Sequence, residues 1–283
     1  RPRAAELLGR GERVKLAAAK DPTDRDRRVV EDERERLAEV VAGLMGSLDD
    51  GASLHPLLAS REKVERVGVI LMTADRGLCG GFNANPNRAA KTFIRGEEAA
   101  GREVVIIACG KKGRSYLKHA DHEIFRYHEA PTFETLVSTA KAIATEASTM
   151  FTTNGDDDVP RVDRWVLIYN YFKNVLTQEV RTAPVLPFPQ PEVSEPALSP
   201  VFEPEPKKLL EHLVPVALES LLQQAMFNSI AAEIAARRMA MDAATDNASE
   251  LISDLTLEYN RERQAAITKE LMEIIGGAEA LKG

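Results

Sequence analysis

Two glycine-rich loops are the first places in this sequence where chemistry could occur. Residues 75–81 read DRGLCGG and follow an apolar run, and residues 110–115 read GKKGRS and follow a second one. A loop between a strand and a helix is where dinucleotide-binding folds hold phosphate. Neither loop has the spacing G-x-G-x-x-G or G-x-x-x-x-G-K-[ST], and the carboxylate of Asp75 would repel phosphate. We therefore interpret both loops as structural turns.

The histidines and cysteines do not define a catalytic or metal site. His119, His122 and His128 are close in sequence, but no pattern of Cys or carboxylate residues completes a metal site with them. Cys79 could act as a nucleophile only beside a positioned base, and the sequence designates none. Because Cys109 is the only other cysteine, a disulfide-stapled scaffold and a typical structural zinc site are excluded. We expect no catalytic residue, no metal and no cofactor.

A stronger polar signal lies in the C-terminal quarter of the chain. Two groups of polar residues, at 237–247 and 260–270, interrupt an apolar pattern there. They comprise Arg237, Arg238, Asp242, Thr245, Asp246 and Asn247, then Asn260, Arg261, Arg263, Gln264, Thr268 and Glu270. Asn, Thr and Gln cost helix propensity or side-chain entropy and return little when they only contact solvent. A solvated helix face and a docking site for a partner both explain the pattern, and composition leaves the two open.

The segment that holds these polar groups is predicted to be one long helix. Residues 216–275 contain no Gly or Pro, and 12 of them are Ala, the best helix former. At about 1.5 Å per residue such a helix is roughly 90 Å long, which exceeds the diameter of a globular domain of this size. Its apolar residues form a narrow stripe, as a coiled-coil partner needs. Residues 37–48 show the same spacing, so the two ends are predicted to pair as an antiparallel coiled coil.

Between the two helical ends the pattern becomes that of an α/β domain. Continuous apolar runs, typical of buried parallel strands, lie at 67–73, 104–109 and 164–169. A short strand at 123–127, an edge strand at 174–182, and helices at 86–100, 111–119 and 132–152 complete the pattern. Repeated βα units imply a parallel sheet with right-handed crossovers. The predicted fold class is α/β, with a parallel-sheet domain inserted between long N- and C-terminal helices.

Composition sets the domain boundaries and argues against two classes of protein. Eight of the 15 prolines lie in 184–206, a stretch with no Lys or Arg, which we interpret as an extended acidic connector. The predicted parts are therefore 1–66, 67–206 and 207–283. A net charge of −7 disfavours a nucleic-acid binder. The longest aliphatic run, Val69 to Met72, is far short of the roughly 20 residues that span a bilayer.

Ordered motifs make the sequence similar to the gamma subunit of F-type ATP synthases. They are TADRGLCGGFN at 73–83, AMDAATDNA at 240–248, and YNRERQAAITKE at 259–270 with EIIGGA at 273–278. The similarity extends from about Leu37 to the C-terminus. The resemblance implies a Rossmann-like foot domain at 67–206 and a non-catalytic rotor shaft made of the two terminal helices.

The resemblance also implies partners and a location. In this family the shaft turns inside a hexamer of alpha and beta subunits, and the foot lies near the epsilon subunit and the membrane c-ring. Proton or sodium-ion flow turns the ring and shaft, and ATP is made on the beta subunits. The chain would then be a peripheral protein on the cytoplasmic face of the bacterial plasma membrane, bound through the complex, with no nucleic-acid partner.

Two sets of residues can be transferred from the family by motif. The resemblance implies that one set contacts a beta-subunit loop and influences coupling: Arg237, Gln264, Thr268 and Glu270. The other set belongs to the signature loop of the foot, with a structural or contact role: Asp75, Arg76, Gly77, Cys79, Gly80 and Asn83.

The N-terminus departs from the family, and other functions stay open at this point. Only LAAAK at 16–20 matches the family's first helix, and Asp21-Pro22 follows where that helix would continue. Residues 1–36 are therefore divergent. The alternative from another class is a soluble nucleotide-binding α/β enzyme with a helical dimerisation tail. A coiled-coil scaffold without a rotary role is the third hypothesis.

Overall fold

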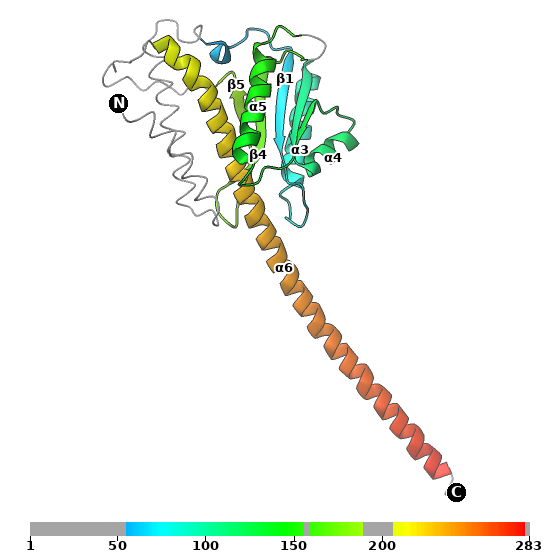
Figure 1. The fold of residues 1–283 in the computed structure, drawn as a ribbon. Helices are drawn as coiled ribbons and strands as arrows, with labels where there is room; N and C mark the ends of the chain where they lie inside the picture. The colour runs from blue at the N-terminus through cyan, green and yellow to red at the C-terminus, as the bar shows by residue number, and fades with distance from the viewer. Residues whose placement is uncertain (1–54, 156–158, 189–205, 281–283) are drawn as a thin grey trace, which may run out of the picture. The chain divides into compact units, whose positions relative to one another are not determined.

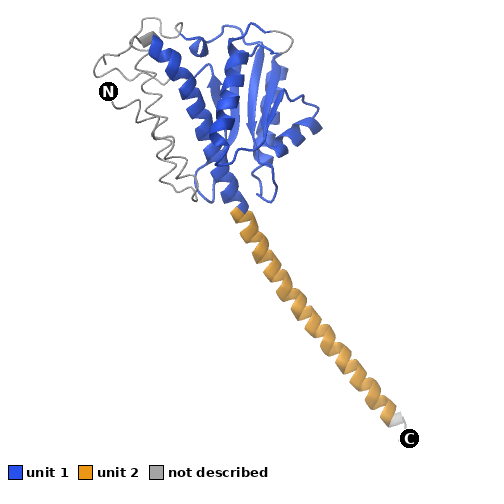
Figure 2. Ribbon diagram, in the orientation of Figure 1, with its two compact units in different colours: residues 1–237 blue, residues 238–283 orange. Residues whose placement is uncertain are grey.

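The computed structural model describes residues 55–155, 159–188 and 206–280 (Figure 1). The helix predicted at 37–48, its coiled-coil pairing and the divergent residues 1–36 lie outside the described residues, as does most of the predicted connector. The described parts contain the whole predicted α/β pattern and the long C-terminal helix. The chain divides into two compact units, Arg1–Arg237 and Arg238–Gly283 (Figure 2).

A five-stranded sheet in the order β3-β2-β1-β4-β5 forms the centre of the first unit. Its strands are β1 (Arg66–Met72), β2 (Glu103–Cys109), β3 (Arg126–His128), β4 (Arg164–Phe172) and β5 (Gln178–Leu186). All neighbours pair in parallel except β5, which is antiparallel to β4. The apolar run at 67–73 becomes the central strand β1, in which six of seven residues are buried. The predicted α/β class with a mainly parallel sheet is confirmed.

Helices cover both faces of this sheet (Figure 1). They are α3 (Ala84–Ala99), α4 (Lys111–His119), α5 (Leu136–Thr152) and α6 (Pro206–Ala280), with a short 3₁₀ helix at Pro56–Leu58. Because successive side chains of a strand point to opposite faces, β1 contributes to two cores. Ile70 and Met72 pack with α5 and α6, whereas Val69 and Leu71 pack with α3 and α4.

The first part of α6 belongs to the α/β core, which corrects the predicted boundary at 206/207. Leu218, Leu222 and Met226 are fully buried in the cluster that also holds α5 and one face of the sheet. The sequence interpretation placed these residues on a coiled-coil stripe. The spacing i, i+3, i+4 marks an apolar helix face but does not say what covers it. Here the sheet and α5 cover it.

The first residues of the predicted connector, 184–186, belong to strand β5. The edge strand was expected at 174–182, but residues 174–177 form a turn in which the Asn174 carboxamide oxygen accepts hydrogen bonds from the backbone N–H groups of Leu176 and Thr177. Strand β5 therefore begins later and includes Pro184, which the prediction assigned to the connector. Proline lacks a backbone donor and occurs on edge strands or at bulges. Strand β5 is an edge strand, and the register shifts at Trp165/Val166, opposite Pro184.

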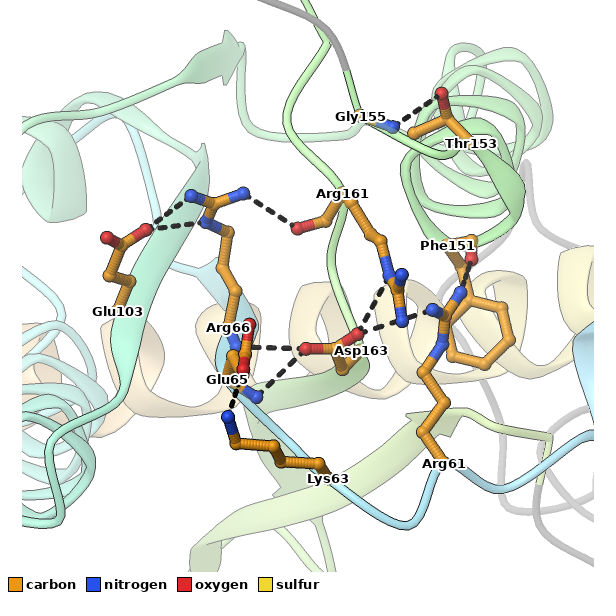
Figure 3. A network of polar contacts seen from close by, with 10 residues as sticks. All are labelled: Arg61, Lys63, Glu65, Arg66, Glu103, Phe151, Thr153, Gly155, Arg161 and Asp163. Atoms are coloured by element: carbon orange, nitrogen blue, oxygen red, sulfur yellow. Dashed lines mark hydrogen bonds and ion pairs between the residues drawn. The ribbon is translucent and has the colours of Figure 1, made fainter.

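A buried carboxylate fixes the amino-terminal end of the central strands (Figure 3). Asp163, whose side chain is only 5% exposed, precedes β4 and accepts hydrogen bonds from the backbone N–H groups of Glu65 (2.9 Å) and Arg66 (3.1 Å). It also pairs with Arg161 at 3.2 Å and Arg61 at 3.4 Å. Burial alone would raise the pKa of Asp163, but these two N–H groups and two guanidinium groups outweigh it, so the pKa lies below its usual 3.8.

The Asp163 network predicts acid sensitivity. A pKa lowered by folding stabilises the folded chain above the unfolded pKa of about 4, and this contribution is lost as the pH falls through the folded pKa. We expect Asp163→Asn to reduce the free energy of unfolding at pH 7 by about 3 kcal/mol, because Arg61 and Arg161 lose their partner. Urea unfolding at pH 7 and at pH 3 tests this. An equal loss of unfolding free energy at both pH values would contradict the lowered pKa of Asp163.

Candidate functional site

The signature loop follows β1 at the carboxyl end of the sheet, and its first residue caps a helix. The Asp75 carboxylate accepts a hydrogen bond from the backbone N–H of Lys111 at 2.7 Å, and the N–H of Ala130 lies at 3.4 Å from the same oxygen. Lys111 is the first residue of α4. The N-terminus of a helix is the place where nucleotide-binding folds hold phosphate. In this chain a side chain of the protein itself provides the anion at that place.

The two glycine-rich loops hold each other through Thr73. The Thr73 hydroxyl donates to the carbonyl of Cys109 (3.0 Å) and accepts from the backbone N–H of Gly113 (2.8 Å). Gly110 has a φ of +98°, and a Cβ at this position would lie 2.2 Å from the carbonyl oxygen of Thr73. Only glycine combines this backbone conformation with so close an approach. These contacts support the interpretation of both loops as structural turns.

Asn83 organises the interior of the signature loop. Its carboxamide oxygen accepts from the backbone N–H of Ala74 at 2.8 Å, and its NH₂ group lies 3.2 Å from both the Arg76 carbonyl and the Cys79 sulfur. Cys79 is buried, whereas Arg76, Gly77 and Gly80 are exposed. Gly80 takes a φ of +54°. The loop is thus closed from within by Asn83.

Neither cysteine is prepared for nucleophilic chemistry. Burial raises the pKa of the Cys79 thiol, and Glu233 adds to this shift while Arg237 opposes it. Cys109 is fully enclosed, and burial raises its pKa to about 12. A nucleophilic cysteine needs a lowered pKa. Both thiols therefore stay protonated near neutral pH.

The three histidines have separate partners. His128 pairs with Glu146 at 2.9 Å, and His122 lies 3.7 Å from Glu98. The Nδ1 atom of His119 is 2.7 Å from the carbonyl oxygen of Ser115. Among residues 55–155, 159–188 and 206–280, no group of His, Cys, Asp or Glu is arranged to hold a metal ion.

The four residues transferred as coupling positions do not form one patch. Arg237 ends the first unit, is about one third exposed, and forms an ion pair with Glu233 at 2.6 Å one turn earlier. Gln264, Thr268 and Glu270 belong to the second unit and are exposed. Gln264 and Thr268 lie one turn apart on one helix face, and the Thr268 hydroxyl donates to the Gln264 carbonyl at 2.8 Å. Glu270 lies on a different side of the helix.

Comparison with known proteins identifies the family. A family model for ATP synthase matches residues 14–281. The ATP synthase gamma chain of Chlorobaculum parvum is 43% identical over 253 residues, which cover 87% of this chain and 84% of the relative. The chain belongs to the ATP synthase gamma-chain family. The gamma chain of Sorangium cellulosum is 40% identical over 243 residues, covering 81% of this chain and 73% of that relative.

Solved structures share the fold of the family. A central-stalk chain of the Tetrahymena thermophila mitochondrial ATP synthase matches with a TM-score of 0.54 at 21% identity, over 83% of this chain and 98% of that one. A chain of the Euglena gracilis mitochondrial ATP synthase matches with a TM-score of 0.57 at 17% identity, over 98% and 95%. At these identities the likeness concerns the fold alone.

Family membership decides between the functional hypotheses. The gamma chain is a non-catalytic subunit of the ATP synthase complex, which confirms the resemblance seen in the motifs. It decides against the nucleotide-binding enzyme with a dimerisation tail. None of the described helices combines the length and apolar content that a membrane span requires. The complex to which gamma chains belong is nevertheless associated with a membrane.

The signature loop packs against α6 and β4, which the sequence did not indicate. Phe82 and Cys79 belong to a small buried cluster with Ala232 of α6, and Asn170 of β4 donates a hydrogen bond to the Phe82 carbonyl at 3.0 Å. These partners lie 88 or more residues away in sequence. Motif similarity marked the loop, but no local pattern could indicate its partner.

Proposed function

We propose that this chain is the central rotor shaft of a proton- or sodium-translocating F-type ATP synthase. In this role it couples rotation of a membrane c-ring to conformational change, and so to ATP synthesis or hydrolysis, in the beta subunits. Its partners are the alpha–beta hexamer around the C-terminal helix, and the epsilon subunit and c-ring at the α/β domain. The assembled complex places the chain on the cytoplasmic face of a bacterial plasma membrane.

The observation that best supports a shaft is the exposure of the second unit. Its helical residues present large apolar side chains that are 45–71% exposed: Met241, Leu251, Ile252, Leu255, Leu257, Tyr259, Ile267, Leu271, Met272, Ile274 and Ile275. Most helical stability in proteins comes from tertiary packing of an apolar face, so a helix of this kind requires a partner. An exposed apolar surface of this extent marks an interaction site.

Two partners can cover this surface at once. The predicted antiparallel coiled coil would bring the segment at 37–48 onto one part of the apolar stripe, and the alpha–beta hexamer would enclose the rest. Polar positions such as Gln264 and Glu270 then supply contacts that differ in strength between rotor angles. Coupling requires such differences, because a partner that interacts equally with every state shifts none of them.

Reconstitution tests the proposed function. We expect the chain to assemble with alpha and beta subunits from the same organism, and a bead attached to its α/β domain to rotate when ATP is added. The isolated chain should not bind nucleotide, since Asp75 occupies the anion position at the start of α4. A failure to join the hexamer would contradict the rotor hypothesis. Assembly without rotation would instead favour the coiled-coil scaffold.

A further inference from the structure

A small cluster joins the signature loop to one turn of the C-terminal helix. Ala74, Cys79, Phe82 and Ala232 are buried in it, and Phe172 and Ala236 pack against them. We refer to these six residues as the loop–helix clamp. The clamp is separate from the larger core, in which the earlier turns of α6 contact the sheet and α5.

The clamp is the last place along α6 where the helix is enclosed. Ala232 is fully buried and Ala235 is 6% exposed, and no described side chain of α6 beyond Ala235 is buried. The second unit begins at Arg238 (Figure 2). A load that acts on α6 beyond Ala235 therefore reaches the clamp before it reaches the larger core.

The loop side of the clamp is built as a rigid support. Asn83 bonds across the loop to Ala74 and Arg76, and the backbone N–H of Phe82 donates to the carbonyl of Cys79 at 3.1 Å. The Asn170 side chain, 2% exposed, ties the Phe82 carbonyl to β4. The hydrogen bond between Asn170 and Phe82 is buried, and a bond in such a setting fixes the position of the groups that it joins. Force on the loop therefore passes directly to the sheet.

The helix side of the clamp consists of small side chains flanked by a charge pair. Ala232 and Ala236 lie one turn apart, so the loop can approach the helix backbone closely. Glu233 and Arg237 pair along the helix, and both charges influence the pKa of Cys79. The pair thus lies beside the loop as well as on the helix.

We infer that the loop–helix clamp transmits torque and bending load between the α/β domain and the C-terminal helix, with Phe82 and Ala232 as positioning residues. The inference rests on the proposed rotor function and adds a role for the signature loop to it. When the clamp is loosened, the base of the helix can slip against the signature loop under load, so part of each rotation is lost without turning the α/β domain. The deficit grows as the opposing ion gradient increases.

Phe82→Ala tests the clamp, with Ile94→Ala as its matched control. Ile94 of α3 is fully buried in the core on the other face of the sheet, in a cluster whose described members include no residue of α6. Both variants remove a buried side chain of the same domain, so both should lower the melting temperature of the chain. In vesicles that hold the complete complex, only Phe82→Ala should reduce the ions pumped per ATP hydrolysed, by about twofold or more at a high gradient.

Two further variants keep the test decisive. Phe82→Leu, which keeps a large apolar side chain in the cluster, should restore most of the pumping ratio. Phe172→Ala, at the partly buried rim of the clamp, gives the readout if Phe82→Ala does not fold. The inference is overturned if these clamp variants pump as many ions per ATP as Ile94→Ala. A wild-type complex that does not pump at all would instead contradict the proposed rotor function.

Discussion

Replacing Gly110 by alanine is expected to unfold the α/β domain or to lower its free energy of unfolding by about 4 kcal/mol or more. The backbone at Gly110 has a φ of +98°, where an L-residue is strained, and the new Cβ would lie 2.2 Å from the carbonyl oxygen of Thr73. That oxygen belongs to backbone and cannot move aside as a flexible side chain can. The clash is relieved only if the two glycine-rich loops separate. This separation also breaks the hydrogen bond between Thr73 and Gly113.

Gly77→Ala is the matched control for this substitution. Gly77 is exposed in the signature loop, and an added Cβ there meets no atom within 4 Å. Its free energy of unfolding should stay within about 0.5 kcal/mol of the wild-type value. Urea unfolding followed by the fluorescence of Trp165, the only tryptophan and fully buried, measures both variants. Similar unfolding midpoints for the two would show that the loops are not held together as described.

Much of the α/β domain was predictable because its strands are buried on both faces. A central parallel strand reads as a continuous apolar run, and the run at 67–73 differs from the observed β1 by only one residue at each end. The limits of the edge strand β5 were less predictable. Strand β5 is only partly buried, so turn chemistry at Asn174 and a bulge opposite Pro184 decided its limits.

The spacing of apolar residues could not show which part of α6 packs in the domain core and which part is exposed. Leu218 and Leu222 lie in the domain core, whereas Leu251 and Leu255 are more than 50% exposed, yet both pairs have the same helical spacing. The spacing reports an apolar face, and only tertiary structure reports its partner. The contacts of Asp75 and Phe82 could not be predicted from the sequence for a related reason. Their partners at Lys111 and in α6 are distant in sequence.

The transferred coupling residues of the second unit are expected to affect activity without affecting folding. Gln264 and Glu270 are exposed, and within the described part of the chain neither side chain has a polar partner. Removing them therefore leaves no polar group of the described residues unsatisfied. Arg237 differs, because Arg237→Ala breaks its pair with Glu233 beside the clamp and should change both stability and coupling.

Gln264→Ala is expected to lower the ATP turnover of the assembled complex by about tenfold, with an unchanged melting temperature for the isolated chain. A contact with the beta subunit that lowers the free energy of the rate-limiting rotor position by about 1.4 kcal/mol accounts for a tenfold change. Glu262→Ala, an exposed site two residues away on another side of the helix, is the control and should retain full turnover. If the two variants hydrolyse and synthesise ATP at equal rates, Gln264 does not contact the beta subunit in a way that matters for coupling. If Gln264→Ala slows turnover while binding of the chain to the hexamer is unchanged, the residue acts on the angle-dependent part of the interaction, because a uniform contact would alter assembly alone.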